Sequence, residues 1–428
     1  MNWNSYFKMI NIAIYICIIS ICFADWLFFV AHIGHRYMTW IPELMAMLAF
    51  LYVPAAMALR REYRLPPKYT LLLFVYIIHI GTGYFLNSMD SGPIIVGARQ
   101  FFKFIPIFLL PAVVDFNEKE IKNILILVLL IALVQFPVTI WQRFIQFAAV
   151  KSGDPIGGTL GTNTSGVLSV FLIIVISFLV TFFLKKRISF IVFIILFFLC
   201  FIPTTINETK ITFLLLPFTF ILPIYLGKIK LSKNISKIVP LALFALMAIS
   251  IFISIYNFLG WGKNEADIVK WFSNKQQVEK YTGNTRVIPI VSAFEEISNS
   301  DLKTIIFGYG AGNLSPVYNK SIESDLVEKF SIYKPGGLAI TKLFLEVGFV
   351  GTIIYFLLLS NIFIDGLRLS KLNNDFWGVF SLCMSVFVCF YAVSHTYFNT
   401  LNINLFVYLL FFLSGHMVSY KRKSVQIS

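Results

Sequence analysis

Long apolar stretches recur along the chain and are separated by short polar segments. A membrane-spanning helix needs about 20 apolar residues to cross a bilayer core roughly 30 Å thick. The stretches have this length and predict about 12 spans, at residues 9–31, 38–59, 69–86, 95–114, 121–150, 166–184, 188–205, 211–227, 238–259, 337–364, 376–394 and 401–418. The expected fold is therefore all-α, a polytopic membrane helix bundle.

Composition excludes a soluble globular protein. Hydrophobic residues fill 58% of the 428 positions and charged residues only 13%, and the mean hydropathy is +0.81. Soluble domains carry about 25% charged residues and roughly 45–50% apolar ones. The net charge of +14 would indicate nucleic acid in a soluble protein, but in a membrane protein the placement of basic residues matters more. No nucleic-acid partner is expected.

Basic residues are concentrated in alternate loops. One set of loops, with the C-terminal tail, contains Arg60, Arg61, Arg64, Lys68, Lys119, Lys122, Lys185, Lys186, Arg187, Lys228, Lys230, Lys233, Lys237, Arg368, Lys371, Lys421, Arg422 and Lys423. The short loops of the opposite side contain only Arg36, Lys151 and Lys210. Because cytoplasmic loops hold the excess of Lys and Arg, both termini are expected in the cytoplasm.

One connection, over residues 260–336, is much longer than the others. On the same topology it forms an extracytoplasmic loop domain. It separates a first part with nine spans, residues 1–259, from a last part with three spans and a cytoplasmic tail, residues 337–428. Its first half, 261–278, mixes apolar and polar residues in a pattern typical of an amphipathic helix at the membrane interface.

A glycine turn lies in the second half of this loop. Gly308, Gly310 and Gly312 form a GxGxG sequence after a short helix that is expected to follow Arg286. The turn is not a dinucleotide fingerprint, because the spacing of the third glycine is wrong and no strand–helix unit surrounds it. It allows positive φ angles and close approach of the backbone to another chain or a ligand. Glu346 lies in the next span, where a carboxylate costs about 2.5–3.5 kcal/mol, so it should face protein or water and have a partner.

No metal or cofactor site is expected. All five cysteines fall inside the expected spans, where they behave as small apolar side chains. Neither CxxC nor HExxH spacing occurs, the five histidines are scattered, and no nucleotide-binding P-loop is present.

Four local sequences occur in a fixed order: Gly-Gly-Thr-Leu-Gly-Thr-Asn at 157–163, Asn-Glu-Thr-Lys at 207–210, Thr-Arg at 285–286 before the expected helix and glycine turn, and Leu-Glu-Val-Gly at 345–348 with Gly351. Together with the single large outer loop, they resemble the bacterial O-antigen polymerase and O-antigen ligase superfamily, which includes capsule polysaccharide polymerases. The resemblance implies a multi-span, GT-C-like, metal-independent glycosyltransferase in the bacterial plasma membrane. Its substrates would be sugars carried on undecaprenyl diphosphate at the outer face.

The resemblance also implies that Lys210 and Arg286 bind the donor diphosphate. The family more often has Arg at the first position, and Lys binds phosphate as a point charge without the bidentate fork of Arg. Ligases of the family, and some of its polymerases, carry a His shortly before the Glu-x-Gly of the tenth span. The matching position here is Gly337 or close by, and none of the five histidines lies there. Polymerisation is therefore favoured over ligation.

The two cations suit the chemistry, because positive charge next to a departing diphosphate stabilises its developing negative charge. Each also has a structural alternative. Arg286 could pair with Glu295 or Glu296 inside the loop, and Lys210 could be an ordinary interfacial lysine.

A general base must lie within reach of the attacking sugar hydroxyl. The candidates are Glu208, Asp154, Glu346 and His395. Their structural alternatives are a solvated loop carboxylate, or a histidine with satisfied hydrogen bonds.

The expected substrate-binding residues are Arg99, Lys103, Arg143, Asn163, Gly308, Gly310 and Gly312. Arg99 and Lys103 are four residues apart, which places them on one face of a helix. Charges inside a span are costly unless they line a polar cavity, and Arg143 is expected to do so for the same reason. The alternative for the pair is packing against Asp90 or Glu346. The glycine turn could instead serve only as structural support for the arginine before it.

Three functions are open at this point. The first is a polymerase that joins lipid-linked oligosaccharide repeat units of O-antigen or capsule type. The second is a ligase that transfers finished glycan to another acceptor, and the third is a transporter or flippase for lipid-linked oligosaccharide. Transporters often contain internal repeats and paired broken helices, which the sequence does not display. The expected partners are undecaprenyl-diphosphate-linked oligosaccharide and membrane lipid, and a chain-length regulator could be a further one.

Overall fold

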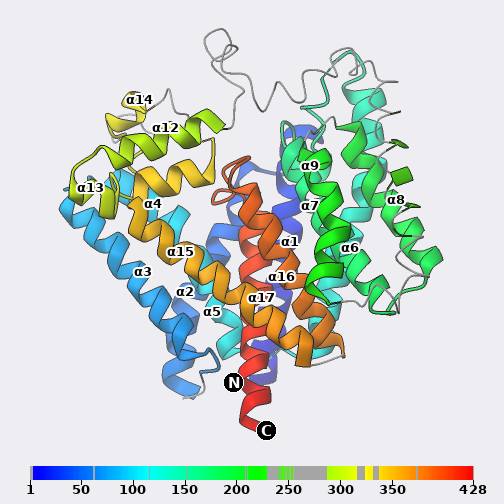
Figure 1. Ribbon diagram of the computed structural model, residues 1–428, viewed down its shortest axis with the longest axis horizontal. Coiled ribbons are helices and arrows are strands. Elements are labelled where there is room, and N and C mark those ends of the chain that lie inside the picture. Colours follow the sequence, from blue (N-terminus) through cyan, green and yellow to red (C-terminus); the bar gives the residue numbers. More distant parts are fainter. Residues whose placement is uncertain are drawn as a thin grey trace. The chain divides into compact units, whose positions relative to one another are not determined.

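The structure is a computed structural model that describes residues 3–60, 63–114, 116–150, 152–207, 209, 211–228, 241, 243, 244, 246, 247, 250, 251, 254, 287–315, 323–330, 337–372 and 375–427. Within these residues the regular secondary structure is helical and contains no strand (Figure 1). The all-α prediction is confirmed.

The helices, in chain order, are α1 (Trp3–Asp25), α2 (Ile41–Arg60), α3 (Pro67–Leu86), α4 (Ser91–Phe102), α5 (Phe104–Val113), α6 (Glu118–Trp141), α7 (Ser165–Leu184), α8 (Phe190–Ile206), α9 (Ile211–Leu226), α12 (Val287–Ser298), α13 (Leu302–Phe307), α14 (Leu326–Lys329), α15 (Ala339–Leu372), α16 (Phe376–Ser394) and α17 (Asn404–Ile427). Short π-helical turns, Trp26–Val30 and Gln142–Gln146, extend α1 and α6. Two short 3-10 turns cover Arg36–Trp40 and Gly158–Leu160.

Seven helices in the described part of the chain are long and apolar enough to cross a membrane, and one bent helix pair makes an eighth candidate. The seven are Met9–Val30, Tyr37–Ala58, Pro67–Leu86, Glu118–Gln146, Ser165–Leu184, Ala339–Leu372 and Phe376–Ser394. Two further apolar helices, Phe190–Ile206 and Leu214–Leu226, are shorter. The chain is therefore a membrane-embedded bundle of helices. Most of the predicted span at 238–259 lies outside the described residues.

The chain divides into two compact units. Unit 1 contains Met1–Met45, Val114–Glu265 and Asp365–Phe390. Helix α6 begins at a capping box, in which Asn117 Oδ1 accepts from Glu120 N at 3.0 Å and Glu120 Oε2 accepts from Asn117 N at 2.7 Å. Helix α7 is apolar on all sides and packs against α8 and α9, as expected for a central helix (Figure 1).

Unit 2 contains Ala46–Val113, Ala266–Ile364 and Tyr391–Ser428. Within it, α17 packs along α5, and α13 packs against α3. The short helix predicted after Arg286 is confirmed as α12, which begins one residue later. A small apolar core connects α12 to the start of α15, and its buried members are Ala293, Ile297, Leu314, Phe330 and Leu345.

One predicted span is not a continuous helix. Residues 95–114 form parts of α4 and α5, which are bent by 43° on either side of Lys103. Pro106 explains the break, because it has no N–H to donate to the Phe102 carbonyl and its ring would clash with that carbonyl. The amphipathic helix expected at 261–278 lies outside the described residues.

Candidate functional site

The glycine turn of unit 2 has the backbone that its sequence predicts. The φ angles of Gly308, Gly310 and Gly312 are +69°, +96° and +92°. A Cβ atom on Gly312 would lie 2.1 Å from the carbonyl oxygen of Pro93. Only glycine fits this position, because the turn packs directly on the backbone of α4.

Glu346 accepts three hydrogen bonds from the residues at the end of this turn. Its Oε2 accepts from Gly312 N at 2.7 Å, and its Oε1 accepts from Leu314 N at 3.2 Å and from the Ser315 hydroxyl at 3.1 Å. The carboxylate is fully buried. The expectation that Glu346 faces protein and has a partner is confirmed.

Lys342 is a second buried charge beside Glu346. It lies one helical turn earlier on α15, its Nζ is 3.6 Å from Glu346 Oε1, and the two side chains are 1% and 0% exposed. The lysine also donates to the Ser315 hydroxyl, which is 3.2 Å from Gln100 Oε1. The sequence reading missed Lys342. Its spacing of four residues from Glu346 was the available signal.

Helix α15 is kinked where it meets the glycine turn. Gly348 has φ 68° inside this helix. A Cβ on Gly308 would lie 2.6 Å from Gly348 N, and a Cβ on Gly348 would lie 2.6 Å from Gly308 N. The Val347 carbonyl lies 2.9 Å from His79 Nε2, which must be the donor because a carbonyl only accepts. The two glycine-containing motifs of unit 2 therefore form one docked structure.

Tyr309 connects the same turn to α12. Its N donates to the Leu345 carbonyl at 2.7 Å, and its hydroxyl donates to Glu296 Oε1 at 3.0 Å. Burial raises the pKa of Tyr309, so the hydroxyl stays protonated and keeps this donor at neutral pH. Glu296, one of the two carboxylates considered as partners of Arg286, thus accepts from a tyrosine.

In unit 1, the glycine-rich segment 157–163 is held by two amide side chains from the end of α6. Gln142 Oε1 accepts from Gly158 N at 2.8 Å, and Gln142 Nε2 donates to the Gly158 carbonyl at 3.1 Å. Gln135 Oε1 accepts from Thr159 N at 2.8 Å, and Gln135 Nε2 donates to Thr159 Oγ1 at 2.6 Å. The sequence reading missed both glutamines, whose spacing of seven residues places them on one helical face.

Asn207 joins the second motif to the helix that follows the first. Its Nδ2 donates to the Ser165 carbonyl at 3.0 Å and lies 2.9 Å from Ser169 Oγ, and the side chain is fully buried. The remaining charged members of the motif, Glu208 and Lys210, lie outside the described residues, as does Arg286.

A small polar pocket lies beside the first motif. It has a volume of about 170 Å³ and is lined by Asp25, Phe29, Leu160, Gly161, Thr162 and Thr164. A Cβ on Gly161 would be 3.0 Å from Asp25 Cβ, so the glycine brings the turn against the carboxylate side chain. Asp25 and two threonine hydroxyls could bind a hydroxylated ligand, and the sequence reading did not select this carboxylate.

The other expected site residues are dispersed. Lys103 is buried at the α4–α5 bend and donates to Asn404 Oδ1 at 2.8 Å, while Arg99 is exposed at the end of α4. Arg143 donates to the Val150 carbonyl at 3.0 Å. Asn163 is exposed, with φ 60°. Lys103 is the C-cap of α4 and keeps helical backbone angles, so the common helical face of the first pair stays a prediction.

Two base candidates differ in accessibility. His395 is fully buried: its Nδ1 lies 2.8 Å from the Tyr391 carbonyl and 3.0 Å from Thr400 Oγ1, and its Nε2 lies 3.3 Å from Tyr355 Oη. Asp154, by contrast, is exposed. Among the described residues, no group of three or more His, Cys, Asp or Glu side chains could hold a metal ion.

The chain matches no known protein-family model and no curated protein sequence. The resemblance to polysaccharide polymerases and ligases therefore depends on the four motifs themselves.

Proposed function

We propose that the chain is a polysaccharide polymerase, a metal-independent glycosyltransferase with about 12 spans and a GT-C-like fold. It joins undecaprenyl-diphosphate-linked oligosaccharide repeat units at the outer face of the bacterial plasma membrane, to make a polymer of O-antigen or capsule type. The growing chain on its diphosphate carrier is the donor, and a fresh lipid-linked unit is the acceptor.

The supporting observation is that segments within or next to three of the motifs are hydrogen-bonded to one another inside each unit. In unit 1, Asn207 of the second motif is hydrogen-bonded to the start of α7, directly after the first motif. In unit 2, Glu346 of the fourth motif binds the backbone of the glycine turn that follows Arg286. These contacts support the proposal because they join sequence segments that carry the resemblance.

In this proposal, Arg286 and Lys210 bind the diphosphate that leaves the donor. When a sugar hydroxyl attacks the anomeric carbon of the donor, the bond to the diphosphate oxygen breaks and negative charge develops on that oxygen. Arg286 and Lys210 stabilise this charge. Each of them is close in sequence to an anchored element: Arg286 precedes α12, and Lys210 precedes α9.

The attacking hydroxyl must lose its proton to a group that the substrate can reach. Glu346 and His395 are buried and hydrogen-bonded, which favours positioning roles for both. Asp25 and Asp154 are exposed, and Asp25 lines a polar pocket. In this proposal the base is one of these two aspartates or Glu208.

A deletion strain complemented with variants tests the function by the glycan ladder. Loss of a polymerase leaves single repeat units, whereas loss of a ligase leaves long polymer on the lipid carrier. We expect Arg286→Ala to give single units and Arg368→Ala, an exposed arginine of a predicted cytoplasmic loop, to give the normal ladder. A normal ladder from stably expressed Arg286→Ala would refute the proposal. Accumulation of lipid-linked units in vesicles without chain growth would favour a transporter.

A further inference from the structure

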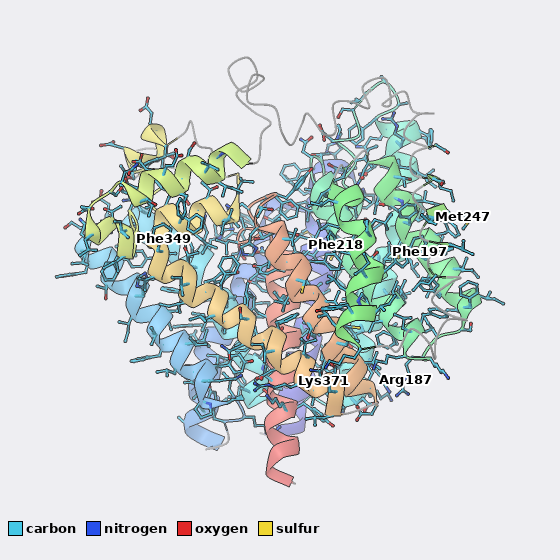
Figure 2. All side chains as sticks on the ribbon, in the orientation of Figure 1. Arg187, Phe197, Phe218, Met247, Phe349 and Lys371 are labelled. Carbon is cyan, nitrogen blue, oxygen red and sulfur yellow. The ribbon has the colours of Figure 1, made fainter. Side chains whose placement is uncertain are left out.

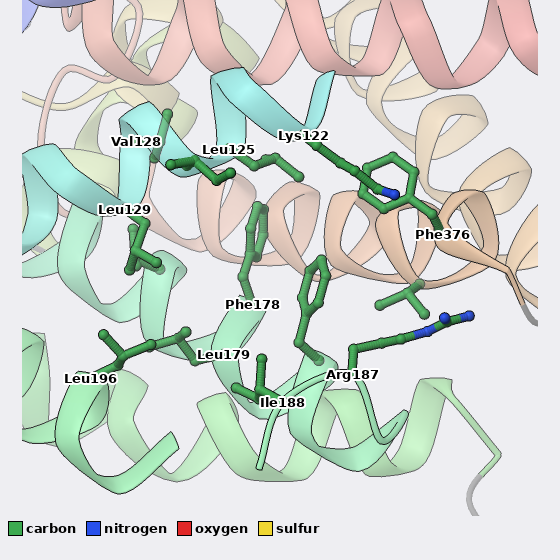
Figure 3. Close-up of a pocket in the computed structure, with 14 residues that line it drawn as sticks. Lys122, Leu125, Val128, Leu129, Phe178, Leu179, Arg187, Ile188, Leu196 and Phe376 are labelled. Atoms are coloured by element: carbon green, nitrogen blue, oxygen red, sulfur yellow. The ribbon is translucent and has the colours of Figure 1, made fainter. Parts of the chain in front are cut away.

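A largely apolar pocket of about 410 Å³ lies inside unit 1, between α6, α7, α8 and α16. Leu125, Val128 and Leu129 of α6 line one wall, and Phe178 and Leu179 of α7 line another. Figure 3 shows that this apolar part is continuous with an end where two cationic side chains are placed. The pocket thus has an apolar body and a basic mouth.

The basic mouth is formed by Lys122 and Arg187. In Figure 3 the lysine ammonium and the arginine guanidinium lie at the same end as Phe376, whereas Leu129 and Leu196 line the far end. The Lys122 ammonium is 5.0 Å from the centroid of the Phe376 ring. Both cationic side chains therefore line this end of the pocket.

The mouth is located where helices end. Lys122 is near the start of α6, Arg187 is in the connection between α7 and α8, and Phe376 is the first residue of α16. Leu129 is two turns further along α6, roughly 10 Å deeper at 1.5 Å per residue. In a membrane protein, this arrangement places the cations at headgroup level and the apolar body at the level of the acyl chains.

The two cationic side chains at the mouth favour an anionic headgroup. Lys122 Nζ is also paired with Glu118 Oε1 at 2.5 Å, so a phosphate at the mouth would share this lysine with a carboxylate. Figure 2 places Lys371 at the same end of the view as Arg187, and both belong to unit 1. Basic pockets between membrane helices on the cytoplasmic side bind anionic lipid headgroups.

We infer that this pocket binds one anionic glycerophospholipid of the surrounding bilayer, with its phosphate at Lys122 and Arg187 and an acyl chain along Leu129, Phe178 and Leu196. The site is independent of the proposed glycosyl transfer. The ligand is a lipid of the bilayer around the protein. It fills a space between four helices that side chains leave empty.

Native mass spectrometry of the full chain in detergent tests this inference. The probes are dioleoyl phosphatidylglycerol, dioleoyl phosphatidylcholine with the same chains and no net charge, undecaprenyl monophosphate and inorganic phosphate. We expect phosphatidylglycerol to bind most tightly. Lys122→Gln and Arg187→Gln should each weaken it about fivefold, the effect of about one charge at a membrane surface.

Matched controls separate a specific site from general charge. Lys119→Gln, at the start of α6, and Lys186→Gln, in the connection between α7 and α8, remove exposed lysines that do not line the pocket, and should leave binding unchanged. Lys122→Arg should retain binding. Leu179→Trp fills the apolar body and should weaken both phospholipids together. Size-exclusion profiles and circular dichroism establish that each variant is folded.

Three results would overturn the inference. The first is equal affinity for the two phospholipids, and the second is unchanged binding in folded Lys122→Gln and Arg187→Gln. The third is tighter binding of undecaprenyl monophosphate than of phosphatidylglycerol, or competition by inorganic phosphate at the same concentration as lipid, since either would assign the mouth to a different ligand.

Discussion

The two units hold their glycine-containing turns by different chemistry. In unit 1, neutral amides of α6 bind the turn, and Gln142 satisfies both the N–H and the carbonyl of Gly158. In unit 2, a carboxylate binds the turn, and Glu346 can only accept. A neutral amide can pair with a single peptide group, whereas a buried carboxylate needs several donors and a counter-charge, which the loop and Lys342 provide.

This difference has an energetic consequence. Removing one partner of a neutral hydrogen bond leaves an unsatisfied polar group, which costs about 1–3 kcal/mol. Removing one partner of a buried ion pair leaves an uncompensated charge, which costs about 3–5 kcal/mol. The charged turn of unit 2 should therefore be the more sensitive of the two.

The largest effect is expected for Glu346→Ala. The substitution leaves Lys342 buried without its counter-charge and three loop donors without their acceptor, so the free energy of unfolding should fall by about 3–5 kcal/mol. Unfolding measured in phospholipid bicelles checks this. The double variant Lys342→Met/Glu346→Gln should lose less than the sum of the two single losses. Additive losses would show that the two charges do not stabilise each other.

Gly312→Ala is expected to rank second. A left-handed φ costs a residue with a Cβ about 1–2 kcal/mol, and the added carbon would lie 2.1 Å from the Pro93 oxygen. The free energy of unfolding, measured again in bicelles, should therefore fall by more than about 2 kcal/mol. Gly81→Ala is the matched control in the same unit: no atom lies within 4 Å of its Cβ position, and it is inside α3. It should be neutral or stabilising by up to about 1 kcal/mol, and equal losses at both glycines would contradict the account.

In unit 1, Gln142→Leu should have a smaller effect. It removes both hydrogen bonds to Gly158, for a loss of about 1–3 kcal/mol. Ser177→Ala is the control, because the Ser177 hydroxyl bonds only within its own helix, to the Ile174 carbonyl. If Gln142→Leu costs more than Glu346→Ala, the proposed contrast between neutral and charged turns is wrong.

The smallest effect concerns pH. Hydrogen bonds from the hydroxyl and the amide of Thr304 lower the pKa of Asp301, which caps α13. Because the folded pKa is below the unfolded value of about 3.9, the cap contributes stability above that pH and loses it as the pH falls through the folded pKa. Asn also caps helices but does not titrate. The free energy of unfolding should be measured for the wild type and for Asp301→Asn from neutral to acid pH. We expect the wild type to lose stability relative to the variant as the pH falls. A difference between the two proteins that does not change with pH would contradict this.

Local patterns in the sequence predicted the local features. Apolar length predicted helices, the glycine spacing predicted the positive φ angles of Gly308, Gly310 and Gly312, and the cost of an intramembrane carboxylate predicted a partner for Glu346. The bend at Lys103 could also be predicted from the sequence, because Pro106 has no N–H to donate to the carbonyl of the preceding turn.

The features that the sequence did not predict are contacts between different segments of the chain. Nothing local indicates that Gln142 bonds to Gly158, sixteen residues later, or that Asp25 lines a pocket with the glycine-rich segment. Periodicity places a side chain on a helical face, but it does not identify the neighbour of that face. Lys342 was within reach of the i, i+4 rule and was overlooked beside Glu346.

The most direct test of the central claim is chain growth in proteoliposomes that contain the purified chain and lipid-linked repeat units extracted from the deletion strain. The wild type and Gly81→Ala should convert these units into a ladder of longer lipid-linked glycans, and Arg286→Ala should leave them as single units. A ladder from Arg286→Ala, or only single units from the wild type, would contradict the account.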